Sequence, residues 1–146
     1  MKTGKVTATR YHDISCGHRV YGHESKCAHL HGHNYRFWFT IEADKLDSVG
    51  RVLDFSVIKT QLCEWLEIHW DHKFLIWNED PIFGELIKID PKGVELVAFN
   101  PTAENIAKHM VEVIAPALLN NLGARLIKCV VEETRKCSAA YEITGE

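Results

Sequence analysis

The segment from His31 to Glu42 limits the possible folds of this chain more than any other feature. Large apolar side chains recur there at every second position, and polar side chains occupy most positions between them. This is the period of a β-strand with one buried face. We predict a strand over residues 34–42, with Trp38 on its polar face covered by a neighbouring element. The residues of the buried face are Tyr35, Phe37, Phe39 and Ile41.

Two histidines precede this strand at positions of the same parity, so His31 and His33 are expected to project from its buried face. Neutral imidazoles at this spacing can hold one Zn²⁺, Cu²⁺, Ni²⁺ or Fe²⁺ ion. Residues 5–15 form a predicted first strand that ends near His18. If the two strands pair as a hairpin, His18 lies opposite His31. Three imidazoles with one open position are typical of a catalytic zinc site.

Two other interpretations of these residues stay open at this stage. Cys16, Cys27 and two of the histidines could instead enclose a structural zinc ion, or the histidines could bind no metal. Cys27 itself has two possible roles. Beside a metal and several imidazoles its thiol could act as a base or nucleophile, whereas an ordinary cysteine is a small apolar filler.

Four further positions are candidates because of their charge. Asp71 could orient His72 at the end of a predicted helix, although adjacent Asp-His pairs are common by chance. Glu104 lies in the first turn of a second helix, where a carboxylate ordinarily only favours the helix dipole. Glu133 continues the apolar face of the preceding strand, so it must pair with a ligand, an arginine or a backbone amide.

The remaining pattern predicts an α+β fold in which two helices pack on one antiparallel sheet. The first helix begins near Asp54 or Ser56 and ends near residue 70; the second begins at Thr102 and ends before Gly123. Short strands are predicted at 86–89 and 94–97, and further strands between 125 and 141. Cys63 is expected near the polar edge of the first helix. The predicted apolar stripes are Ile58, Leu62, Trp65, Leu66 and His69, and Ile106, Met110, Val113, Ile114 and Ala117.

Composition excludes several function classes. The 146 residues fit one domain, 1–146, and the charge of 17 minus 20, or −3, includes no basic run that could follow a nucleic acid backbone. No apolar stretch is long enough for a signal peptide or a membrane span. Five cysteines without a regular spacing are expected to be reduced thiols in the cytoplasm.

With these residues assembled, the chain resembles the 6-pyruvoyl-tetrahydropterin synthase family, which includes the 6-carboxy-tetrahydropterin synthases. The resemblance covers nearly the whole length, from Cys16-Gly17-His18 through Cys27 and His31-Gly32-His33 to three later motifs. The spacing Cys-x₃-His-Gly-His is similar to that of the 6-carboxy branch, which acts in queuosine biosynthesis. The later motifs are Asp71-His72, Pro101-Thr102-Ala103-Glu104-Asn105 and Glu133-Thr134.

This resemblance implies a tunnelling fold (T-fold), a four-stranded antiparallel sheet with two helices on one face. Such units assemble into a barrel as a homotrimer or homohexamer, with active sites between subunits. It also implies that His18, His31 and His33 bind Zn²⁺ and that Cys27 is the catalytic base.

The resemblance further implies that Asp71 and His72 form a partner acid-base pair, and that Glu133 anchors a pterin with help from Glu104. The implied substrate is 7,8-dihydroneopterin triphosphate. The implied products are 6-carboxytetrahydropterin, acetaldehyde and triphosphate. Formation of pyruvoyl-tetrahydropterin and a non-catalytic zinc-stabilised binding module are the alternatives. The basic residues that could hold the triphosphate are Arg10, Arg19, Lys26 and Arg51.

Overall fold

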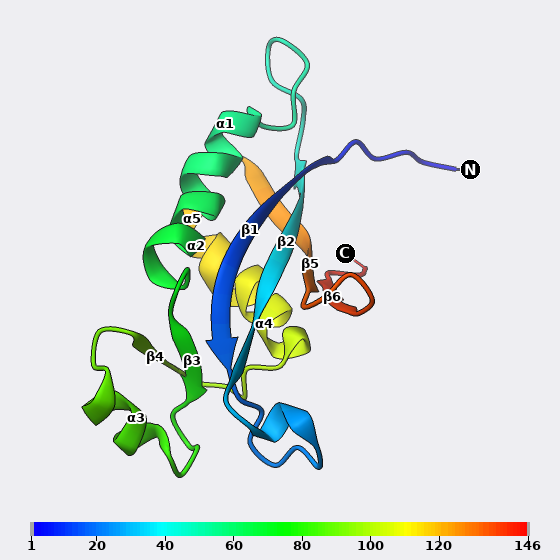
Figure 1. Cartoon of the computed structure of the whole chain (residues 1–146). Helices are drawn as coiled ribbons and strands as arrows, with labels where there is room; N and C mark the ends of the chain where they lie inside the picture. The colour runs from blue at the N-terminus through cyan, green and yellow to red at the C-terminus, as the bar shows by residue number, and fades with distance from the viewer. Residues whose placement is uncertain (1, 146) are drawn as a thin grey trace.

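A long β-hairpin forms the centre of the fold in a computed structural model that describes residues 2–145. Strand β1 (Ala8–His18) pairs antiparallel with β2 (His31–Ala43), from Ala8 opposite Ile41 to His18 opposite His31 (Figure 1). The buried face predicted for β2 is confirmed, and in β1 every second side chain from Ile14 to His18 is buried. The hairpin therefore brings the predicted histidine positions to one end of the sheet.

The sheet is wider than predicted. Six strands lie in the order β4-β3-β1-β2-β5-β6, so the expectation of a four-stranded antiparallel sheet was wrong. Strands β5 (Ala124–Glu132) and β6 (Ser138–Glu142) continue it antiparallel beside β2. On the other side, β3 (Phe74–Trp77) and β4 (Val94–Val97) run parallel to β1. Parallel strands need a crossover between them.

A helix supplies that crossover and replaces a predicted strand. Residues 86–89 belong to α3 (Phe83–Ile89), whereas the strand predicted at 94–97 is confirmed. Phe83, Leu86 and Ile89 recur at intervals of three, which is a helical spacing that the four-residue run Leu-Ile-Lys-Ile conceals. Short apolar runs of this length are ambiguous between strand and helix.

Two long helical segments cover one face of the sheet (Figure 1). The first consists of α1 (Phe55–Ile58), a π-helical turn η2 (Lys59–Cys63) and α2 (Glu64–His69). The second consists of α4 (Ala103–His109), a π-helical turn η3 (Met110–Ile114) and α5 (Ala115–Leu118). The predicted caps are confirmed, since Asp54 accepts from the Ser56 amide and Thr102 accepts from the Asn105 amide.

The π-helical turns explain why parts of the predicted apolar stripes were wrong. A π turn contains an extra residue, so it rotates the following side chains relative to an unbroken α-helix. Cys63 is accordingly buried rather than at a polar edge, and His69 is exposed. In the second segment, Val113 is 53% exposed and Val111 is buried in its place.

The core lies between the helices and the inner face of the sheet. Tyr35, Phe37, Phe39 and Ile41 are all at most 1% exposed, as predicted. The same inner face extends to His18, which is 1% exposed. Within residues 2–145, no helix has both the length and the apolar character needed to cross a membrane.

Candidate metal centre and active site

Three imidazoles converge at the end of the β1–β2 hairpin. His18 and His31 are directly paired across the two strands, and His33 lies two residues further on the same face of β2. One ligand nitrogen from each of these histidines lies within 4.8 Å of the other two. The ring centroids are 4.6 to 5.1 Å apart. The structure therefore brings together the three residues that the sequence selected as metal ligands.

Backbone carbonyls fix two of the rings. Nδ1 of His18 lies 2.6 Å from the carbonyl oxygen of Pro101, and Nδ1 of His31 lies 2.7 Å from that of His29. Because a carbonyl only accepts, each Nδ1 must carry the hydrogen, and in the neutral ring Nε2 is then the acceptor. Metal-binding histidines are commonly held in this way by an acceptor on the second nitrogen.

The three Nε2 atoms have no hydrogen-bond partner among the described residues, although all three are buried. A buried polar atom without a partner costs about 1–3 kcal/mol, so three in one place require an explanation. A divalent metal ion would satisfy all three at once. Three neutral nitrogen donors suit Zn²⁺ and leave a position open for a reactant.

The carboxylate of Glu133 lies beside this cluster. Its Oε2 is 2.9 Å from Nε2 of His33 and 3.4 Å from Nε2 of His18, without the angles of a hydrogen bond. Contact with His18 holds the pKa of Glu133 below its usual value, and burial opposes this. Burial also lowers the pKa of His33, which favours its neutral, metal-binding form. Glu133 thus extends the inner face beyond β5, as predicted.

Tyr35 is a site residue that the sequence pattern placed only in the core. Its ring centroid lies 5.3 Å from that of His33 and 5.7 Å from that of His18, and its side chain is 1% exposed. Its hydroxyl oxygen has no hydrogen-bond partner among residues 2–145. Burial raises the pKa of Tyr35, so the group is a neutral donor. The alternating pattern could not distinguish a tyrosine that lines a site from one that only packs.

Comparison with known proteins places this centre in a family. The model of the family described as 6-pyruvoyl tetrahydropterin synthase matches residues 7–144. The chain belongs to this family. A relative from Rickettsia typhi, named 6-carboxy-5,6,7,8-tetrahydropterin synthase, is 35% identical over 133 residues, which cover 90% of this chain and 96% of the relative. A relative of the same name from Aquifex aeolicus is 34% identical, over 81% of this chain and 76% of the relative.

Solved structures share the fold. An uncharacterized protein, WS1659, from Wolinella succinogenes superposes with a TM-score of 0.83 at 23% identity, covering 96% of this chain and 99% of that one. The 6-pyruvoyl tetrahydropterin synthase of Caenorhabditis elegans superposes with a TM-score of 0.68 at 25% identity, covering 99% of each chain. The predicted α+β fold with T-fold relatives is therefore confirmed, apart from the number and direction of its strands.

In this family member, Cys27 lies in the loop that joins the two histidine-bearing strands. It occupies a short 3₁₀ helix, η1 (Lys26–Ala28), and is half-buried with a free thiol. Neither Cys27 nor Cys16 belongs to the cluster of potential ligands found among the described residues. Burial raises the pKa of Cys16 to about 12, so it stays a protonated thiol. The geometry thus gives no support to a closed zinc site made with cysteines.

Asp71 and His72 form the predicted pair, but on the edge of β1. Asp71 accepts from the Ser15 amide at 2.9 Å, and its other oxygen lies 2.9 Å from Nδ1 of His72. Burial raises the pKa of Asp71, but the Ser15 and His72 contacts outweigh it and the net shift is downward. The imidazole of His72 is 80% exposed, and its backbone has a φ of +61°. The pair is rigidly attached and open to solvent.

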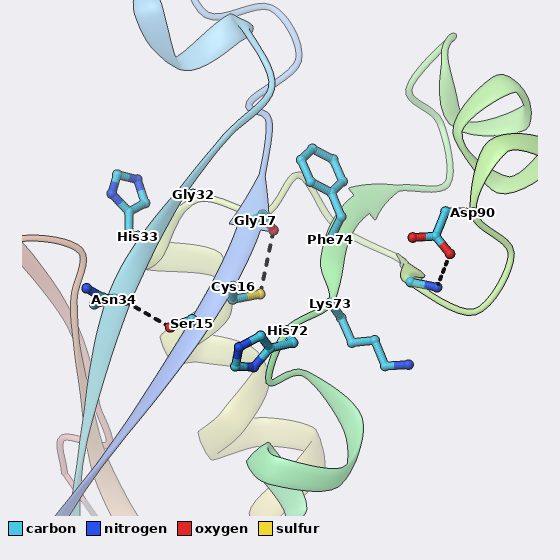
Figure 2. Close-up of a pocket in the computed structure, with 11 residues that line it drawn as sticks. Ser15, Cys16, Gly17, Gly32, His33, Asn34, His72, Lys73, Phe74 and Asp90 are labelled. Atoms are coloured by element: carbon cyan, nitrogen blue, oxygen red, sulfur yellow. Dashed lines mark hydrogen bonds between the residues drawn. The ribbon is translucent and has the colours of Figure 1, made fainter.

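Two pockets at this end of the hairpin are each lined by both His33 and His72. The first has a volume of about 520 Å³, and the second, of about 910 Å³, is also lined by Asp71 and Glu133. In Figure 2, the His33 ring extends from the far side of β2, whereas His72 lies beyond β1 toward β3. No hydrogen bond or ion pair between described residues joins His72 to Cys27 or to the three histidines.

Glu104 occupies its predicted place in the first turn of α4 and is exposed. Thr102 caps this helix, and the carbonyl of the preceding Pro101 holds His18. The helix therefore begins next to the metal centre. No contact of the Glu104 side chain appears among the hydrogen bonds and ion pairs of residues 2–145. The role of Pro101 could not be predicted, because no local pattern marks a carbonyl that binds a ring 83 residues away.

Proposed function

We propose that this protein is a zinc-dependent carbon–carbon lyase, a 6-carboxy-tetrahydropterin synthase of queuosine biosynthesis. It would convert 7,8-dihydroneopterin triphosphate and water into 6-carboxy-5,6,7,8-tetrahydropterin, acetaldehyde and triphosphate. The observation that carries this proposal is the group of three buried Nε2 atoms without partners, with a carboxylate 2.9 Å from one of them. The names of relatives 33–35% identical to this chain support the choice of reaction.

His18, His31 and His33 would hold the zinc ion through Nε2. The donor set fits, because three buried imidazole nitrogens converge and backbone carbonyls hold two of the rings. When bound, the ion would supply Lewis acidity for side-chain oxygens of the substrate that gain negative charge. The Nδ1 contacts of His18 and His31 would keep the two rings from turning away.

Glu133 would anchor the pterin. A carboxylate accepts hydrogen bonds, and a pterin offers a ring N–H and an exocyclic amine side by side. Because the pKa of Glu133 is held low, the group is ionised and ready to accept. Glu104, at the adjacent start of α4, would assist. In this arrangement the substrate side chain would point toward the histidines.

Cys27 would remove a proton from the substrate side chain, and His72, oriented by Asp71, would move a second proton. Oxidation of the side chain is balanced by reduction of the pterin ring, so no nicotinamide or flavin is needed. Because His72 faces solvent in one chain, we propose that it serves the Cys27 of a neighbouring copy. A homotrimer or homohexamer built from one domain per chain would provide that arrangement.

A second candidate is formation of 6-pyruvoyl-tetrahydropterin at the same site. The fold and 25% identity shared with the Caenorhabditis elegans 6-pyruvoyl tetrahydropterin synthase favour it. The two reactions differ in whether a carbon–carbon bond breaks. Acetaldehyde among the products therefore distinguishes them.

The test is anaerobic incubation of zinc-loaded protein with 7,8-dihydroneopterin triphosphate, followed by mass spectrometry and an assay for acetaldehyde. We expect the carboxylated product and acetaldehyde in equal amounts. Cys27→Ala should lower turnover by about 10²-fold or more while zinc content stays at the wild-type level. Cys137→Ala, at an exposed cysteine, is the control and should keep normal turnover. A pyruvoyl product, or loss of zinc from Cys27→Ala, would contradict the proposal.

A further inference from the structure

The loop that carries Cys27 has almost no core of its own. Residues 19–30 leave β1 after His18 and return to β2 at His31, at the lower end of the hairpin in Figure 1. No residue of this loop is buried, and the 3₁₀ helix η1 has no side-chain cap. Packing therefore contributes little to its position, and hydrogen bonds must hold it.

Arg19 makes the contacts that connect this loop to the body of the protein. Its Nε and one terminal nitrogen bind the two carboxylate oxygens of Asp80 at 2.6 and 2.9 Å. Its other terminal nitrogen donates to the carbonyl oxygen of Ala28, the residue after Cys27, at 3.3 Å. The amide of Val20 also donates to the carbonyl of Cys27 at 2.8 Å. The guanidinium thus spans both sides of the loop.

Asp80 is a fixed anchor for this arginine. It is 1% exposed, lies between β3 and α3, and also accepts from the Ile82 amide at 3.0 Å. A buried carboxylate without a counter-charge would be costly, so the planar, bidentate pairing holds the arginine strongly in one orientation. Because Nε and both terminal nitrogens of Arg19 already donate to Asp80 and Ala28, Arg19 is not expected to bind a substrate triphosphate.

A second contact supports the same loop from the opposite side. Asn100 accepts from the Tyr21 amide at 3.1 Å and donates to the Tyr21 carbonyl at 2.9 Å. The next residue, Pro101, holds the ring of His18. The loop and the metal centre are therefore attached to the same segment before α4.

We propose that the Arg19–Asp80 pair is a positioning device for Cys27, acting through the Ala28 carbonyl. This inference rests on the proposed function, in which Cys27 removes a proton. A base must lie within hydrogen-bond reach of that proton, and a displacement near 1 Å can lower the rate by about 10²-fold. A loop without a buried core cannot meet this requirement unless something fixes it. The ion pair does so, because its buried member, Asp80, lies outside the loop.

The test uses Asp80→Asn, which keeps the shape of the anchor but removes its charge. We expect amide hydrogen exchange in residues 20–30 to rise about tenfold or more, with β1 and β2 unchanged. With zinc content normal, kcat should fall by about 10- to 100-fold while KM changes less than about threefold, because Glu133 and the histidines are untouched. A purely structural role of the pair would not lower kcat while leaving KM nearly unchanged.

Two further variants make the result decisive. Arg19→Lys keeps a charge opposite Asp80 but cannot bind both carboxylate oxygens and Ala28 together, so it should reproduce the effect even if Asp80→Asn fails to fold. Asp47→Asn breaks the exposed Asp47–Arg51 pair in the loop at the opposite end of the hairpin and should change neither measurement.

Unchanged exchange in residues 20–30 of both variants would overturn the inference. So would faster exchange with unchanged kcat, because the pair would then hold the loop without serving the chemistry. Failure of the proposed function is recognised separately, since Cys27→Ala would then keep its turnover in the same assay.

Discussion

Replacing His31 with alanine tests whether this residue is a metal ligand or only a packing residue. In the metal-free protein, the buried Nε2 of His31 has no partner, which destabilises the fold by about 1–3 kcal/mol. His31→Ala relieves this cost. It also removes the hydrogen bond from Nδ1 to the His29 carbonyl, which contributes about 1 kcal/mol. The imidazole is only half-buried, so little packing is lost. We therefore expect the metal-free stability to change by no more than about 2 kcal/mol.

With metal present, the wild-type protein should be more stable than His31→Ala, and by more than the two differ without metal. Zinc at 100 times its Kd stabilises the folded wild-type protein by about 2.7 kcal/mol, because it binds only the assembled site. For a chain of this size this corresponds to an increase in Tm of about 5–11 °C. His31→Ala keeps two of the three ligands and should lose most of this increase.

The assay is thermal unfolding with a chelator and with added zinc, combined with metal analysis of the purified protein. His29→Ala is the matched control, because the side chain of His29 is exposed while its backbone carbonyl still holds residue 31. It should show the full zinc-dependent shift. A full zinc-dependent shift in His31→Ala would refute the metal centre. A loss above about 3 kcal/mol without metal would show that the ring is mainly a packing residue.

Three other predictions concern Tyr35, His109 and Gly32. Tyr35→Phe should stabilise the metal-free protein by about 1 kcal/mol in urea unfolding, because the lost hydroxyl has no partner there; destabilisation would contradict this. Burial lowers the pKa of His109, so as pH falls the unfolded chain binds this proton before the folded one, and stability should decrease below about pH 6.5. His109→Gln should therefore lose less stability than wild type between pH 7 and 5. An equal loss in both proteins would contradict this role of His109. Gly32→Ala places a Cβ 3.0 Å from the Cys16 carbonyl oxygen, so titration should show weaker zinc binding, whereas Gly84→Ala meets no atom within 4 Å and should bind normally.

The convergence of the three histidines was predictable because it depends on local order. A hairpin with period-two burial fixes which side of each strand a residue occupies, so His18, His31 and His33 share a face once the strands pair. The position of Glu133 followed from the same parity on β5. None of these inferences required knowledge of how distant elements pack.

The buried faces of the helices could not be predicted fully from the sequence. Both apolar stripes lose register at a π-helical turn, and no residue pattern in either segment marks the extra residue. Runs of four residues are too short for period two to distinguish strand from helix: the strand predicted at 94–97 is β4, whereas the one predicted at 86–89 is part of α3 and β3 was not predicted. Their parallel pairing beside β1 depends on tertiary packing alone.

The orientation of the site depends on contacts that are remote in sequence. Arg19 and Asp80 are 61 residues apart, and the Pro101 carbonyl is 83 residues from the ring it holds. Sequence periodicity gives the face of a side chain but not its partner across the fold. The chemistry-bearing residues can therefore be selected from the chain, whereas the groups that hold them in place appear only when the sheet, the loop and the start of α4 are seen together. Variants of the Arg19–Asp80 pair should change rate and loop motion while leaving metal content intact, whereas variants of the three histidines should lower the metal content itself.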